Sequence, residues 1–297
     1  MLDKINPLYF ALSATLCFSY ASTIFTEFAR KASPFWMNSF KAFLATFAFI
    51  ITVFTFNLWT EPKLLTVVAL LTSGCIGLMI GDIFMLNAMA ELGASRMLMI
   101  FGLQPFFLGI GGYIFFNQNF SLMNLAGLIC MSLCLFTISL ESYKKSGSWQ
   151  INGLLAGLVA ILLDGCGILL TRYGFENDKG ISPIEVNAIR CLGAIIGFFI
   201  IYFFKEKISF RPTWKKFSKK EKIRIVIGSL LGTFFSLILY LTAVSRGKLS
   251  IVSSVTVTGP MFAASFESIR QRRLPNAYVL LAFIFFVSGF FIFYSIS

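Results

Sequence analysis

The sequence predicts an all-α integral membrane protein whose ten transmembrane helices form two inverted five-helix repeats. Three observations carry this prediction: a very apolar composition, ten apolar runs of membrane-spanning length, and a set of landmarks that occurs twice. Of the 297 residues, 57% are hydrophobic and 13% are charged, with 36 phenylalanines and a mean hydropathy of +0.83. A water-soluble chain of this length needs more polar residues to cover its core, so this composition indicates a membrane protein.

Each apolar run is close to the ~20 residues that a helix needs to cross ~30 Å of hydrocarbon. Helices are required because backbone amides in lipid must form hydrogen bonds within their own segment. All four tryptophans lie at or beyond the ends of runs, as expected for residues at the membrane interface. In order, the runs cover about 7–29, 34–57, 63–90, 96–116, 120–140, 152–172, 184–204, 223–244, 250–269 and 276–296.

The first run is expected to remain as a spanning helix rather than to be removed as a signal peptide. It is long for a signal sequence, it contains Glu27, and it matches a run in the second half that starts near Asn152. We therefore count it as the first of the ten helices.

The landmarks that occur twice are short motifs at the mouths of apolar runs. A serine-proline pair, followed by an asparagine and then a basic residue, recurs 149 residues later. Further along each half, an alanine precedes a proline by 17 residues. The repeat divides the chain into residues 1–145 and 146–297. The two sets are Ser33, Pro34, Asn38, Lys41, Ala88 and Pro105, and Ser182, Pro183, Asn187, Arg190, Ala243 and Pro260.

Five spans in each half is an odd number, so equivalent helices of the two halves are expected to cross the membrane in opposite directions. Inverted repeats of this kind recur in carriers, because exchanging the conformations of the two halves turns an outward-open molecule inward-open. The alternative is a gene duplication that produced a membrane protein without a transport role.

Further motifs lie between the third and fifth runs of each half. The first half contains Gly81-Asp82, Gly93-Ala94-Ser95-Arg96, Gln104-Pro105 and Gln118-Asn119-Phe120-Ser121. The second half contains Gly232-Thr233, Gly247-Lys248 and Thr258-Gly259-Pro260. In this order and spacing the motifs resemble the drug/metabolite transporter superfamily, and specifically its EamA-like members. The resemblance covers nearly the whole chain, and it implies export of a small metabolite with both termini in the cytoplasm.

The chain departs from the pattern of this family at three positions. Many members carry a glutamate at the end of the fourth and ninth helices, where this chain has Gln118 and Arg272. The basic residue early in the second helix is often arginine, whereas here it is Lys41, and its counterpart Arg190 keeps the guanidinium. The departures put any role for the family's carboxylate in doubt.

Lys41 and Arg190 are the first candidates for substrate binding, because each lies about two turns inside its run, where an unpaired charge is costly. A substrate carboxylate or phosphate could compensate them, with bidentate geometry at the guanidinium and a point charge at the ammonium. The alternatives are an intramolecular partner, snorkelling to the interface, or a role as gates. The intramolecular partners to consider are Asp82, Asp164 and Glu185.

Asp82 and Asp164 are the acids placed deepest within their runs, and each lies beside glycine. Burial favours the neutral, protonated form of a carboxylate, so either residue could carry a coupling proton or ion during a transport cycle. The alternative is a fixed ion pair with Lys41 or Arg190.

Pro105 and Pro260 are expected at mid-helix, where proline removes a hydrogen bond, kinks the helix and can serve as a hinge. Polar residues beside them and on the same predicted cavity are further candidates for substrate contact, although bonds between helices explain them equally well. These candidates are Gln104, Thr256, Thr258, Asn38, Asn187 and Tyr240.

The residues needed for enzymatic chemistry are largely missing from the sequence. There is no histidine, no nucleotide-binding loop and no nucleophile beside a base. Cys130 and Cys134 share a helix face, but two thiols without histidine make a poor metal site. We therefore expect no enzyme activity, no cofactor and no bound metal.

Nine of the 25 basic residues crowd into residues 205–224. A short loop beside lipid is a poor nucleic-acid site, so anionic lipid head groups are the expected partner. The loops on this side of the membrane carry 17 lysines and arginines, against 6 on the side of the termini. The positive-inside rule then places the termini outside, whereas the family resemblance places them inside.

Together these observations predict a secondary carrier in the cell (inner) membrane that moves a small organic metabolite, either amino-acid-like or anionic, through a cavity between the halves. Two other functions compete with it: a flippase-type carrier of a lipid-linked head group, and a membrane scaffold or sensor that transports nothing. A flippase needs a cavity open sideways to lipid, and a scaffold needs no polar cavity.

Overall fold

A computed structural model describes residues 6–118, 121–146, 151–204, 210–256, 258–259, 261–262 and 277–296. Every regular element over these ranges is a helix. The first half contains α1 (Pro7–Lys31), α2 (Pro34–Thr55), α3 (Leu64–Ser73), η2 (Gly74–Gly81), α4 (Asp82–Leu92), α5 (Ala94–Ile100), η3 (Phe101–Leu103), α6 (Gln104–Phe116) and α7 (Leu122–Ser146). The second half contains α8 (Ile151–Asn177), α9 (Pro183–Phe204), α10 (Phe210–Lys215), α11 (Lys219–Ser229), η4 (Leu230–Phe235), α12 (Ser236–Arg246), α13 (Leu249–Thr256) and α15 (Ala277–Ile296).

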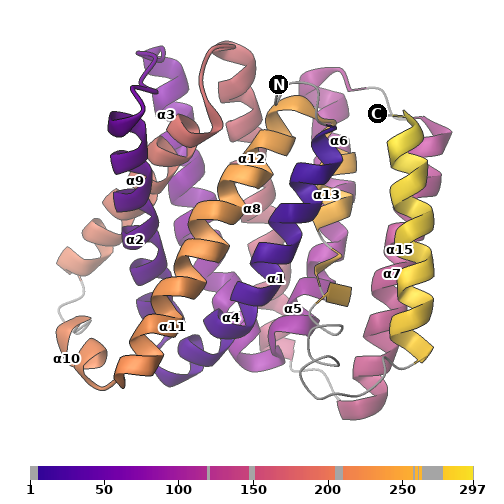
Figure 1. Ribbon diagram of the computed structural model, residues 1–297, viewed down its shortest axis with the longest axis horizontal. Coiled ribbons are helices and arrows are strands. Elements are labelled where there is room, and N and C mark those ends of the chain that lie inside the picture. Colours follow the sequence, from indigo (N-terminus) through magenta and orange to yellow (C-terminus); the bar gives the residue numbers. More distant parts are fainter. Residues whose placement is uncertain are drawn as a thin grey trace.

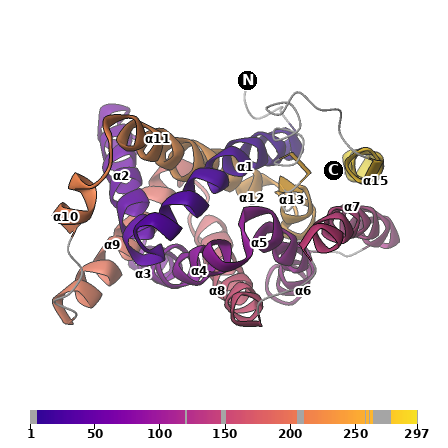
Figure 2. The same cartoon turned by 90° about the horizontal axis from the view of Figure 1, so that it is seen from below.

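The helices form one bundle, in which α1 begins and α15 ends at the same edge (Figure 1). The short helix α10 lies at the opposite edge, and α7 and α15 pair at one end of the bundle, as the view from below also shows (Figure 2). The path from α3 to α4 descends in Figure 1, whereas the path from α11 to α12 ascends.

Each long helix of the first half packs against a helix of the second half. The first helix of one half contacts the third helix of the other, since α1 packs on α12 and α8 packs on η2 and α4. The remaining helices pair with their counterparts: α2 with α9, α6 with α13, and α7 with α15. The contacts therefore repeat in the same pattern on exchange of the halves.

Seven described helices are long and apolar enough to span a membrane: 7–31, 34–55, 64–92, 151–177, 183–203, 219–246 and 277–295. The fourth and fifth expected runs contain shorter apolar helices, at 101–116 and 122–134. Much of the ninth run lies outside the described residues, and so do Glu267 and Arg272. The count of ten helices therefore stays a prediction.

The outward surface of α2 shows how the apolar composition is used. Phe43, Phe47 and Phe54 lie along one side of this helix, and each exposes at least 60% of its surface. A soluble protein would rarely present such a row of aromatic side chains to water. In a membrane, the same row faces lipid.

The repeated serine-proline pairs begin the second helix of each half. The Ser33 hydroxyl accepts a hydrogen bond from the Trp36 amide at 3.0 Å, and Ser182 accepts one from the Glu185 amide at 3.1 Å. The proline that follows each serine opens the helix, where its missing amide leaves no hydrogen bond unmade. The motif therefore acts as a helix start in both halves.

A π-helical segment interrupts the third helix of each half, as η2 and as η4. The packing of η2 is very close, because a Cβ at Gly74 would collide with the backbone carbonyl of Arg190 in α9. Such contact requires glycine at that position. Single-turn π segments inside α-helices are often found at functional sites.

Candidate functional site

A cavity of about 120 Å³ lies between the two halves, close to the midpoint of several spans. Ordered water needs roughly 10–15 Å³ of such space per molecule, so the cavity has room for several waters or a small polar group. Both halves contribute to its walls, which combine ionisable, hydroxyl and aromatic side chains. The lining residues are Ala14, Thr15, Phe18, Lys41, Leu78, Asp82, Met85, Leu98, Phe101, Gln104, Asp164, Gly232, Thr233, Ser236, Leu237, Tyr240 and Thr256.

Lys41 and Asp82 form an ion pair on one wall of this cavity. The Lys41 Nζ lies 2.6 Å from the Asp82 Oδ2, and the two side chains are only 3% and 13% exposed. The ammonium also lies 5.1 Å from the centre of the Phe25 ring. Asp82 is the first residue of α4, directly after the π-helical η2. The sequence had left this pairing open as the alternative to substrate contact, and the structure contains it.

Asp164 lies at the middle of α8 and has a different partner. Its Oδ2 accepts a hydrogen bond from the Gln104 side-chain amide, so two cavity-lining residues from opposite halves contact each other. Gln104 begins α6, immediately after the 3₁₀ turn η3. Pro105 is the second residue of α6 and lies near the middle of the helical stretch formed by α5, η3 and α6, as expected. The 3₁₀ turn η3 lies directly before it, where the missing proline amide interrupts the regular hydrogen bonding.

Arg190 is completely buried, and it is absent from the residues that line the cavity. Its Nε donates a hydrogen bond to the Ser73 hydroxyl at 3.0 Å. Within the part of the chain that the structure describes, its Nη1 and Nη2 have no hydrogen-bond partner. A Cβ placed on Gly77 would lie 3.8 Å from both the Arg190 Nη2 and the Asp164 Cα. The guanidinium and Asp164 therefore lie near each other, on either side of the space that a side chain at Gly77 would fill.

Asn38 and Asn187 bind backbone carbonyls rather than facing the cavity. The Asn38 amide donates to the carbonyls of Leu78 and Met79, each at 3.0 Å. The Asn187 amide donates to the carbonyl of Leu237 at 3.1 Å. These carbonyls belong to the interrupted third helices, where the π-helical register disturbs the usual pairing. Each asparagine thus hydrogen-bonds the backbone of a residue that lines the cavity, Leu78 or Leu237.

Other expected site residues divide between the cavity and the surrounding core. Tyr240 and Thr256 line the cavity, whereas the Thr258 hydroxyl is buried on the Val255 carbonyl at 2.7 Å. Pro260 lies outside the described residues. The Glu185 carboxylate accepts hydrogen bonds from the amide and the hydroxyl of Thr60, each at 2.9 Å. It is therefore paired with neither Lys41 nor Arg190.

Two threonines of the cavity were not singled out from the sequence. Thr15 lies on α1, and Thr233 lies in η4, where its buried hydroxyl has no hydrogen-bond partner among the described residues. A threonine in an apolar run carries little signal, because most such residues bond the preceding helical turn. The repeat spacing contained a clue for Thr15, since it lies 149 residues before Asp164.

Comparison with known proteins places the chain in a family. Residues 6–140 and, separately, residues 151–295 match the EamA-like transporter family. This chain belongs to the EamA-like transporter family. It is therefore an integral, multi-pass membrane protein from a family of transporters, in agreement with its apolar helices. Family membership also makes a small-molecule substrate the expected partner, and EamA-like proteins are transporters rather than enzymes.

Two relatives of this EamA-like transporter come from Listeria, and each is named "Putative sugar uptake protein". The protein from Listeria monocytogenes is 29% identical over 184 residues, which cover 60% of this chain and 62% of that protein. The protein from Listeria innocua is 27% identical over 225 residues, which cover 74% of this chain and 73% of that protein. The first match thus spans less than two thirds of its relative.

The fold is shared with a solved crystal structure that has little sequence in common with this chain. The two superpose with a TM-score of 0.74 over 96% of this chain and 95% of the other, at 12% sequence identity. Over the described ranges, no group of three or more cysteine, aspartate or glutamate residues is arranged to hold a metal ion.

Proposed function

We propose that this EamA-like protein is a secondary carrier of a small organic solute, working by alternating access between residues 1–145 and 146–297. The observation that carries the proposal is the cavity between the halves, where Lys41, Asp82, Gln104 and Asp164 meet close to mid-span. Ionisable residues are rare inside membranes, and they mark substrate or ion pathways when they face an internal cavity.

Several observations support the ten-helix, inverted-repeat part of this proposal. The family matches the chain twice, once in each half. The contacts between helices keep the same pattern when the halves are exchanged. The third helices of the halves run in opposite directions in Figure 1. In carriers with this plan, rocking of the repeats about a central site exposes it to each side in turn.

The charges around the cavity favour an uncharged substrate. Lys41 is paired with Asp82, and the second cation, Arg190, lies beside Asp164, so two positive and two negative side chains balance. The sequence suggested an anionic substrate because the two basic residues needed a compensating charge. Since the two carboxylates supply that charge, an anionic substrate is not required. Thr233, whose hydroxyl has no hydrogen-bond partner in the described part of the chain, and the Phe18 ring both line the cavity and suit a hydroxyl-rich solute with an apolar face.

The proposed substrate class is therefore a neutral polyhydroxylated molecule such as a sugar. The names of both Listeria relatives also refer to the uptake of a sugar. A zwitterionic, amino-acid-like solute also keeps the charges balanced and is the next class to test. We place the protein in the cell membrane, with Asp164 as the residue that binds a coupling proton and Asp82 as the fixed partner of Lys41.

Flux into vesicles tests this proposal. Purified protein, reconstituted in liposomes, is offered a neutral hexose, a zwitterionic amino acid or a dicarboxylate, with flux measured in both directions. The expected result is saturable flux of the hexose, or of the amino acid as second choice. Flux of the dicarboxylate alone, or of no solute by protein whose helical circular dichroism is intact, would contradict the proposal.

A substitution separates proton coupling from binding. Asp164→Asn keeps the shape of the side chain and an oxygen that can accept from Gln104. The variant is expected to retain exchange of the transported solute while losing accumulation driven by a pH gradient. Lys179→Gln, an exposed change in the connection between α8 and α9, is the matched control and keeps both activities. Equal uphill accumulation by Asp164→Asn and the wild type would remove Asp164 from coupling.

A further inference from the structure

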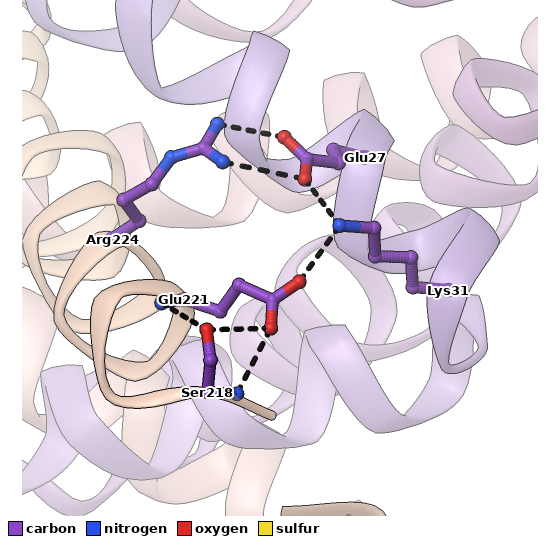
Figure 3. A network of polar contacts seen from close by, with 5 residues as sticks. All are labelled: Glu27, Lys31, Ser218, Glu221 and Arg224. Atoms are coloured by element: carbon purple, nitrogen blue, oxygen red, sulfur yellow. Dashed lines mark hydrogen bonds and ion pairs between the residues drawn. The ribbon is translucent and has the colours of Figure 1, made fainter. Parts of the chain in front are cut away.

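The edge of the bundle at α10 carries a cluster of basic residues whose charge is only partly neutralised. Figure 3 shows the ion pairs that join the end of α1 to the start of α11 there. Glu27 accepts from Arg224 and from Lys31, each at 2.7 Å, and Lys31 reaches Glu221 at 2.8 Å. The second Glu221 oxygen accepts from the amide and hydroxyl of Ser218, each at 2.9 Å. Both of these carboxylates are therefore fully occupied.

Lysines beside this network have no ion pair among the described residues; besides Lys222, whose ammonium lies over the Trp214 ring, these are Lys215, Lys216, Lys219 and Lys220. All four are exposed. They lie within six residues of one another, at the end of α10 and in the first turn of α11. We refer to these four residues as the lysine surface.

Aromatic side chains hold the lysine surface in place. Trp214 stacks on Phe40 with the ring centres 5.0 Å apart, and Phe217 meets the Phe28 ring edge-on at 5.3 Å. Phe217 is buried, and Trp214 also stacks on Trp36. Because these anchors fix the chain on both sides of residues 215 and 216, the two lysines between them extend outward. The surface is thus ordered at low cost in conformational entropy.

The position of the last two lysines is electrostatically unfavourable within the protein itself. Lys219 and Lys220 are the first two residues of α11, where the helix dipole and unpaired amides favour negative charge. Only Glu221 supplies that charge, and it is already shared with Lys31 and Ser218. Sequences that break a local rule of this kind often do so where something outside the chain compensates.

We propose that the lysine surface binds the phosphate groups of anionic phospholipids. Trp214, which is only partly buried, lies directly before the first of these lysines, and tryptophan side chains gather at the depth of the membrane interface. Lipid phosphates lie at that same depth, and four adjacent lysines match a cluster of anionic head groups in charge. The surface lies at the edge of the bundle and is separate from the cavity, so this inference is independent of the transported solute.

Titration of lipid into the purified, detergent-solubilised full chain tests the proposal, with thermal unfolding as the readout. Phosphatidylglycerol is expected to raise the unfolding temperature at concentrations where phosphatidylcholine does not, and added salt should weaken the effect. In Lys219→Gln/Lys220→Gln, the apparent affinity for phosphatidylglycerol should fall about 30-fold, the equivalent of ~1 kcal/mol for each lysine. Lys215→Gln/Lys216→Gln should behave similarly.

The matched control is Lys179→Gln/Lys248→Gln, which removes the same charge from other connections of the chain. It should keep the affinity of the wild type for phosphatidylglycerol. Equal affinities in all three variants would overturn the proposal, and so would equal stabilisation by phosphatidylcholine. Soluble glycerol phosphate is a further arm of the test, and stabilisation by it at the same concentration would point to a free-anion site instead of a lipid surface.

Discussion

Lys41 and Arg190 occupy equivalent positions of the sequence repeat, yet their surroundings differ completely. Lys41 lines the cavity and pairs with Asp82 at 2.6 Å, within its own half. Arg190 is buried behind the cavity, with one hydrogen bond to Ser73 and two guanidinium nitrogens that have no partner in the described structure. The basic residue of the motif therefore forms an ion pair in the first half, whereas in the second half it keeps two nitrogens without a hydrogen-bond partner among the described residues.

The repeat spacing explains the difference. The residue equivalent to Asp82 in the second half is Leu237, 155 residues later, so Arg190 lacks a carboxylate on its own third helix. Conversely, Asp164 on the first helix of the second half is equivalent to Thr15. The halves thus carry their carboxylates on different helices. This asymmetry leaves Asp164 with a hydrogen bond from Gln104 and with the Arg190 guanidinium nearby, so we expect it to be the residue that changes partner.

Breaking the closed pair should have the largest effect on stability. Lys41→Met leaves the Asp82 carboxylate in a nearly dry site without its cation, a loss of about 3–5 kcal/mol in the free energy of unfolding. Unfolding by heat or denaturant measures it. The double variant Lys41→Met/Asp82→Leu, which copies the leucine of the second half, should recover most of the loss. A single variant as stable as the wild type would mean that the pair contributes little.

Removing the partner of Asp164 should have a smaller effect. Gln104→Leu takes away the amide that donates to this carboxylate, at a cost of about 1–3 kcal/mol for an unsatisfied buried group. The cost should fall toward the lower end if Asp164 turns to Arg190 instead. The double variant Gln104→Leu/Arg190→Met removes that alternative. Its loss in free energy of unfolding should therefore exceed the sum of the losses of the two single variants. Additivity would show that Asp164 and Arg190 do not couple.

Arg190→Met should change stability by only about 1 kcal/mol, because two of the Arg190 donors make no hydrogen bond in the described structure and Asp164 keeps the hydrogen bond from Gln104. Solute flux in reconstituted vesicles should nevertheless be abolished, since Asp164 loses its alternative partner. Lys41→Met, in contrast, should lose about 3–5 kcal/mol in the free energy of unfolding. Unchanged flux in a folded Arg190→Met protein would exclude Arg190 from the transport cycle.

The smallest effect is expected outside the membrane spans, at Asp178. A hydrogen bond from Thr66, the Lys63 amide and the Lys63 charge hold the pKa of this carboxyl below its usual range. A lowered pKa in the folded state stabilises the protein above the unfolded value of about 3.9, and this contribution is lost as the pH falls through the folded value. Asp178→Asn should therefore lower the unfolding temperature slightly at pH 7, with the difference from the wild type disappearing in acid. A constant difference at every pH would contradict this assignment.

Much of the fold could be predicted from the sequence, whereas the partners in the site could not. The Ser33 and Ser182 pairs predicted the starts of two helices correctly, because helix caps depend on neighbouring residues only. The roles of Asn38 and Asn187 could not be separated from cavity contacts, because the carbonyls that they bind belong to distant helices, at the π-helical η2 for Asn38 and just after η4 for Asn187. Pro105 marked the break in its run correctly, because the missing proline amide acts on the helical turn just before it, where η3 lies.

The amino-acid sequence alone determined that this is a membrane protein, that it contains an internal repeat and that it resembles EamA-like transporters. These conclusions depend only on hydropathy and on the spacing of motifs, which the sequence contains directly. Tertiary structure decided which charges meet. Four ionisable residues on four different helices can pair in several ways. The packing of the helices decides that Lys41 pairs with Asp82, that Asp164 accepts from Gln104 and that Arg190 donates to Ser73. Distances between helices arise from packing of distant segments, which no local pattern records.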